Sequence, residues 1–153
     1  MSITSIQQRF SVAAAIGVSG GLVAAAITQA DPTFRGDLGF CRCAAAGAFV
    51  AGLLLAGGFG RSGLWGLGIA ALTFVGATLM GAVIAVMLLP VEALIADLGL
   101  RDLAVSISGM AAIAPIFVVE MVTSKGGVLL PWAASVLGIH LIAMAMRARP
   151  ARG

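Results

Sequence analysis

Charged residues are scarce in this chain. Nine lysines and arginines and six acidic residues make up only 10% of the 153 residues. A water-soluble domain keeps about a quarter of its residues charged, so this chain has too little polar surface to cover a soluble globule. Its basic residues lie at the ends of apolar segments and form no clustered stripe of the kind that binds nucleic acid. We therefore exclude a soluble domain and expect no nucleic-acid partner.

Groups that carry chemistry are equally few. The chain has one histidine and two cysteines, and its apolar stretches contain no paired carboxylates and no glycine-rich phosphate loop. Catalysis normally needs a nucleophile, an acid or base, and groups that orient them. The cysteines stand close together as Cys41 and Cys43, which falls short of the four ligands of a structural zinc site. We expect neither an enzyme nor a metal centre.

Apolar residues are abundant: 61% of the chain is hydrophobic, and the mean hydropathy is +1.13. A membrane-spanning helix needs about 20 consecutive apolar residues. The sequence predicts an all-α, polytopic transmembrane helix bundle that forms a single domain over residues 1–153, with four to five spanning helices. The apolar stretches cover residues 10–30, 43–60, 64–89, 103–122 and 128–146.

The segment that follows the third stretch has a different pattern. Residues 91–102 place apolar side chains at helical spacing among charged ones, which predicts a short interfacial helix. Pro90 is expected to end or kink the helix before it. In the fourth stretch, Pro115 interrupts the apolar run and Glu120 closes it. That stretch spans the membrane only if Glu120 lies near the boundary or is paired.

The orientation depends on the number of spans. With five spans, three basic residues fall on the N-terminal side and six on the C-terminal side. Because basic residues collect on the cytoplasmic side, we expect a protein of the bacterial inner membrane with its C-terminus in the cytoplasm. Five spans put the N-terminus outside. If one of the last two stretches only dips into the membrane, there are four spans and both ends are cytoplasmic.

Small residues recur every four positions in the first three stretches, which puts them in one line along a helix face and favours close helix packing. Most of these lines are expected to join helices of this chain, and a line left unused would dock onto another membrane subunit. The predicted packing residues are Gly17, Gly21, Ala48, Gly52, Ala56, Ala77, Gly81 and Ala85.

Two ionisable residues inside the apolar stretches are candidate functional residues. Glu120 is a candidate ion or proton site, and the alternative is a boundary carboxylate that pairs with Lys125 or reaches headgroup water. His140, the only histidine, is a candidate ligand to haem or to a chlorophyll-type pigment. The alternative for His140 is a simple hydrogen bond to a neighbouring helix.

The leading functional hypothesis is a non-catalytic accessory or structural subunit that packs against a larger respiratory, photosynthetic or transport complex. Its expected partners are the lipid bilayer and other membrane subunits. One alternative is a small homo-oligomeric transporter or channel, including a holin-like one. A second is a haem or pigment carrier that uses His140, and apart from that group no cofactor is expected.

Overall fold

The computed structural model describes residues 6–32, 35–95 and 103–148. Within these ranges the chain is helical, and no strand occurs among the described residues. The elements are α1 (Ile6–Ala30), α2 (Leu38–Leu55), the 3-10 helix η2 (Ala56–Gly58), α3 (Gly63–Ile95), α4 (Leu103–Ser124) and α5 (Gly126–Ala148). The predicted all-α transmembrane fold class is confirmed.

Four helical segments are long and apolar enough to cross a membrane, as expected of a small multi-pass membrane protein. Large apolar side chains such as Leu22, Leu72 and Leu141 are more than half exposed on their outer faces, where they would contact lipid. Helix α4 has 22 residues, and the part whose side chains are described, Gly109–Ser124, is apolar. The four spans are Ile6–Ala30, Leu38–Gly58, Gly63–Pro90 and Gly126–Ala148.

Local chemistry sets the start of two helices. Asp37 caps α2, because its side-chain oxygen accepts a hydrogen bond from the backbone N–H of Phe40 at 2.8 Å. Before α3, the chain turns tightly at Gly60 and Gly63, which have φ angles of 76° and 80°. Glycine adopts this left-handed conformation at little cost, so the turn needs glycine at both positions.

Helix α3 does not stop at Pro90 but continues to Ile95. The first five residues of the expected interfacial helix, 91–95, therefore continue α3 instead of beginning a separate helix, and residues 96–102 lie outside the described part of the chain. Helix α4 likewise continues through Pro115. Spanning helices tolerate proline because neighbouring helices and local adjustments re-satisfy the freed backbone groups.

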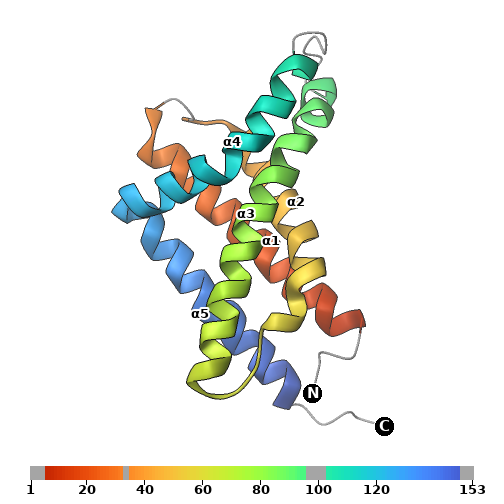
Figure 1. Cartoon of the computed structure of the whole chain (residues 1–153), viewed down its shortest axis with the longest axis vertical. Coiled ribbons are helices and arrows are strands. Elements are labelled where there is room, and N and C mark those ends of the chain that lie inside the picture. Colours follow the sequence, from red (N-terminus) through yellow and green to blue (C-terminus); the bar gives the residue numbers. More distant parts are fainter. Residues whose placement is uncertain (1–5, 33–34, 96–102, 149–153) are drawn as a thin grey trace.

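The first and last helices meet at one end of the bundle, which we call the terminal end (Figure 1). There Gln8, near the start of α1, donates a side-chain hydrogen bond to the carbonyl of Met146 in α5 at 3.3 Å. Arg147 donates to the backbone carbonyl of Phe59, so the connection between α2 and α3 lies at this end too. The described chain thus begins and ends on the same side.

At the other end, which we call the opposite end, α4 connects α3 to α5 (Figure 1). Val23 and Ile27 of α1 pack there with Val122 of α4 and Val128 of α5. Helix α4 runs obliquely from the end of α3 to the start of α5 and does not reach the terminal end. Four of the described helical segments, none of them in α4, are long and apolar enough to cross a membrane, which agrees with the lower of the two span counts that the sequence allows.

The second helix lies against α1 on one side and α3 on the other, at distances that only small residues allow. A Cβ atom added to Gly20 of α1 would overlap the Cβ of Ala48. A Cβ added to Gly47 would overlap the carbonyl oxygen of Gly81 and lie 2.8 Å from the backbone nitrogen of Ala85. Helices that approach so closely gain van der Waals contact, which is the main attraction between helices in lipid.

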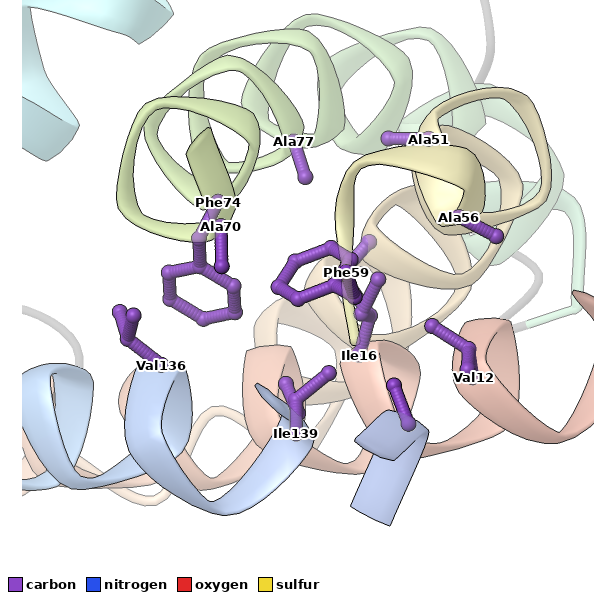
Figure 2. Packing of buried hydrophobic residues seen from close by; sticks show 12 residues of the cluster. Val12, Ile16, Ala51, Ala56, Phe59, Ala70, Phe74, Ala77, Val136 and Ile139 are labelled. Atoms are coloured by element: carbon purple, nitrogen blue, oxygen red, sulfur yellow. The ribbon is translucent and has the colours of Figure 1, made fainter. Parts of the chain in front are cut away.

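A buried apolar cluster fills the half of the bundle nearer the terminal end. Figure 2 shows the rings of Phe59 and Phe74 at its centre, with Val136 and Ile139 of α5 beside them. The two rings are edge to face, with centroids 6.5 Å apart, which is a favourable aromatic geometry. Phe59 belongs to no α-helix, yet it is completely buried. The cluster fixes the connection between α2 and α3 to the bundle.

Candidate functional site

All five α-helices line a cavity of about 430 Å³ that is partly open to the outside. Along α1 its wall extends from Ile16 to Ile27, so the cavity runs from the middle of the bundle towards the opposite end. The walls from the other helices include Ala48 of α2, Phe74 of α3, Ala114 of α4 and Trp132 of α5. The oblique path of α4 closes one side of this space.

The wall of the central cavity is almost entirely apolar. Among the described residues that line it, the only ones with a side-chain nitrogen, oxygen or thiol are Ser19, Asp37, Cys43, Thr78 and Trp132. Asp37 is the capping residue of α2 and lies at the start of that helix. A buried water needs two to four polar partners. The interior of the cavity therefore suits an apolar molecule better than water or an ion.

Two of these polar side chains satisfy each other. The indole nitrogen of Trp132 donates a hydrogen bond to the hydroxyl oxygen of Thr78 at 3.1 Å. The Thr78 hydroxyl in turn donates to the backbone carbonyl of Phe74 at 2.8 Å. The rings of Phe74 and Trp132 are also in contact, with centroids 5.3 Å apart and an interplanar angle of 61°. These bonds hold an aromatic wall in a fixed position at the cavity.

The Ser19 side chain is buried, with 5% of its surface exposed, and its hydroxyl has no hydrogen-bond partner in the described structure. The other helical hydroxyls whose side chains are described each donate to a backbone carbonyl of the preceding turn. They belong to Ser11, Thr28, Thr73, Thr78, Thr123, Ser124 and Ser135. An unpaired buried hydroxyl costs about 1–3 kcal/mol. Ser19 is therefore the exception among them, and it lies in the wall of the cavity.

A second hollow opens on the outside of the bundle between α1 and α5, and we call it the outer groove. It has a volume of about 410 Å³ and is more open than the central cavity. Ala14 and Ala15 line it from α1, and Gly138 and Ile142 line it from α5. Ser19 lines both hollows, whereas Trp132 lines only the central cavity.

The predicted packing residues lie at contacts between helices of this chain. Gly17, Gly21 and Gly52 lie between α1 and α2, Gly81 and Ala85 lie at the contact of α2 with α3, and Ala48 touches both neighbours. Ala56 and Ala77 belong to the buried cluster. These eight small residues are thus used in packing between helices of this chain.

Neither of the two ionisable candidates lines the central cavity. Glu120 is exposed on α4, does not line the cavity, and forms no ion pair with Lys125 in the described structure. His140 is buried in α5, with 5% of its surface exposed, and its Nδ1 atom has no hydrogen-bond partner. It lines neither hollow, so neither would bring a haem or pigment ring against it. Glu120 and His140 line neither of the two hollows that Ser19 lines.

Sequence reasoning missed Ser19 and the inward position of Trp132. In the sequence Ser19 looks like any other serine in a helix. It differs from the others only in lacking a hydrogen-bond partner, which the sequence does not show. Both tryptophans lie near the ends of predicted spans, which favours anchors at the membrane interface. Trp65 is 83% exposed, as an anchor would be. Trp132 instead packs on Phe74 and bonds to Thr78 inside the bundle.

No family model, curated protein or solved structure matches this chain.

Proposed function

We propose that this protein is a non-catalytic membrane protein that binds an apolar, lipid-like molecule inside its helix bundle. The observation that carries the proposal is the central cavity of about 430 Å³. Small-molecule sites typically have volumes of about 300–1,000 Å³, mostly apolar walls and a few well-placed polar groups. The cavity matches this description, with Ser19 as its unpaired polar group.

The geometry supports the other functions less well. A channel needs a polar or charged path through the bundle. In the described structure the cavity wall has one charged residue, Asp37, and Glu120 lies outside the wall. A haem or pigment carrier needs space beside His140, which lines neither hollow. An apolar ligand uses the cavity as it stands.

Filling the cavity should displace the ligand. Ala114 of α4 is buried and lines the cavity, whereas Ala112 of the same helix is exposed and does not. We expect Ala114→Leu to abolish the retention of a bound apolar molecule and Ala112→Leu to preserve it. Native mass spectrometry of protein released from mild detergent measures the bound mass directly. Wild-type protein without any bound mass, or equal retention by both variants, would contradict the proposal.

The orientation that we propose places both described ends in the cytoplasm of a bacterial inner membrane. Along the sequence, the start of α1, the connection from α2 to α3 and the chain from the end of α5 onward contain five basic residues and no acidic residue, whereas the three other connections and the helix ends beside them contain four basic and all six acidic residues. The anionic cytoplasmic leaflet attracts the more positive side of a membrane protein. The five basic residues are Arg9, Arg61, Arg147, Arg149 and Arg152.

An accessory subunit of a larger complex is the second candidate, and the outer groove favours it. Small residues in the groove, including Gly138, leave room at the lipid-facing surface, and nothing lies within 4 Å of a Cβ added to Gly138. Small residues let a partner's transmembrane helix approach closely. The proposed occupant of this groove is therefore one transmembrane helix of a partner subunit.

A substitution that fills the groove tests this candidate. Gly138→Leu should abolish co-migration with a partner on a native gel of solubilised membranes. Gly68→Leu is the matched control, since nothing lies within 4 Å of a Cβ added at this exposed position of α3 and it does not line the groove. Purification of the wild-type chain from its native membrane as a partner-free monomer would count against an accessory subunit.

A further inference from the structure

We infer that Ser19 anchors an uncharged, carbonyl-bearing ring lipid of the quinone class in the central cavity. The inference rests on the proposed function, because it names the chemistry of the molecule that the cavity binds. Ser19 lines the cavity, is 5% exposed, and has an unpaired hydroxyl. A serine hydroxyl can donate one hydrogen bond, and a carbonyl oxygen accepts it. The oxygen atom of this hydroxyl has almost no exposed surface in the structure, so the Ser19 side chain must rotate about its Cα–Cβ bond to present the hydroxyl to a ligand. A carbonyl oxygen of the ligand then satisfies the one polar atom that the described cavity wall leaves unpaired.

The surroundings of Ser19 select an uncharged ligand. Its neighbours along the α1 side of the cavity are Ile16, Gly20 and Val23, and they offer no charge to pair with an ion. An ionised group buried without a partner costs far more free energy than a neutral one. The charged residue of the described wall, Asp37, lies at the start of α2 and caps that helix. A neutral carbonyl suits the site at Ser19, and a carboxylate or phosphate does not.

Aromatic side chains favour a ring as the part of the ligand that reaches the interior. Phe74 and Trp132 line the cavity, and their rings are held against each other and by the bond from Trp132 to Thr78. Aromatic rings pack well on flat rings in offset or edge-to-face geometry. Towards the opposite end the wall continues with Phe117 and Leu89, which suits an apolar tail.

The two tryptophans make this inference measurable. Quinones quench tryptophan fluorescence on close contact, and so do brominated alkanes, which carry no carbonyl. Trp132 lines the cavity, whereas Trp65 is 83% exposed on the outside of the bundle. In the Trp65→Phe variant the emission reports on the cavity. In the Trp132→Phe variant it reports on probe that has only partitioned into the bilayer.

The experiment titrates decylubiquinone and, separately, 1-bromodecane into the full chain reconstituted in lipid nanodiscs. We expect both probes to quench Trp132 saturably and at lower concentration than Trp65. Ser19→Ala should weaken decylubiquinone binding about two- to tenfold, which is the effect of one hydrogen bond, and should leave bromodecane quenching unchanged. Ser135→Ala is the matched control, because this hydroxyl bonds to the carbonyl of Pro131 and lines the outer groove only.

The outcomes separate this inference from the proposed function. If Ser19→Ala leaves the decylubiquinone affinity unchanged while both probes still quench Trp132, the anchor is wrong and the apolar cavity site remains. If bromodecane binds and decylubiquinone does not, the ligand class is wrong. If neither probe quenches Trp132 more strongly than Trp65, both the inference and the proposed function are overturned.

Discussion

The Gly47→Leu variant should lose the folded bundle. A Cβ atom at Gly47 already overlaps the carbonyl oxygen of Gly81 and lies 3.1 Å from the Cβ of Ala85, so a leucine side chain forces α2 and α3 apart. The atoms in the way include backbone, which cannot move aside as the end of a flexible side chain can. We expect the free energy of unfolding to fall by about 3 kcal/mol or more, the upper part of the range for overpacked cores.

Thermal unfolding in mild detergent, followed by near-ultraviolet circular dichroism, measures this loss. Gly68→Leu serves as the control, because nothing lies within 4 Å of a Cβ at that position of α3. Both variants replace a helical glycine with leucine, so backbone propensity favours them equally. Equal stability of Gly47→Leu and Gly68→Leu would show that α2 and α3 do not pack as described.

Labelling from the two sides of the membrane should give an all-or-none difference between the two ends of the bundle. With Cys41 and Cys43 replaced by alanine, Ser62→Cys marks the terminal end and Arg35→Cys marks the opposite end. Both positions are exposed and lie outside the α-helices. In intact spheroplasts we expect a membrane-impermeant maleimide to label Arg35→Cys and leave Ser62→Cys unlabelled.

Inverted membrane vesicles provide the control for this experiment, because they should reverse the labelling pattern. Labelling of Ser62→Cys in spheroplasts would contradict the proposed orientation. Labelling of both positions from the same side would contradict the arrangement of α1, α2 and α3 as successive crossings. A third cysteine at Lys125 tests α4, which should place this position on the same side as Arg35.

Much of the fold follows from hydropathy and helix periodicity. The apolar stretch 10–30 lies within α1, and 128–146 lies within α5. The lines of small residues that include Gly17 and Gly81 indicate close helix contacts, and the structure places both residues at such contacts. A four-residue spacing places small side chains along one face of a helix. Two helices that meet through such faces can pack closely against each other.

The path of α4 could not be predicted in the same way. The stretch 103–122 looks like a fourth crossing with a proline and a glutamate as interruptions. Whether such a helix crosses the bilayer or lies obliquely depends on where its neighbours end. Helix α3 continues through Pro90 to Ile95, and α4 returns only as far as the start of α5. The amino-acid composition of residues 103–122 does not determine where the neighbouring helices end.

The candidate site could not be predicted from the sequence for a related reason. The cavity is defined by the distances between helices, whereas periodicity reports on one helix at a time. Ala77 and Gly81 predict close packing, and both also line the central cavity because α4 lies across the space in front of α3. The sequence position of Trp132 indicates an interfacial anchor, but in the structure its side chain contacts Thr78 and Phe74.

The most direct test of the central claim is an experimental structure of the protein crystallised from a lipidic mesophase without added ligand. We expect elongated density in the central cavity, in contact with Phe74 and Trp132 and ending beside the Ser19 hydroxyl. The contrary result is a bundle in which α4 closes onto α1, with Ala114 in van der Waals contact with Val23 and no space between them. That packing would leave no room for a ligand and would refute the proposed function.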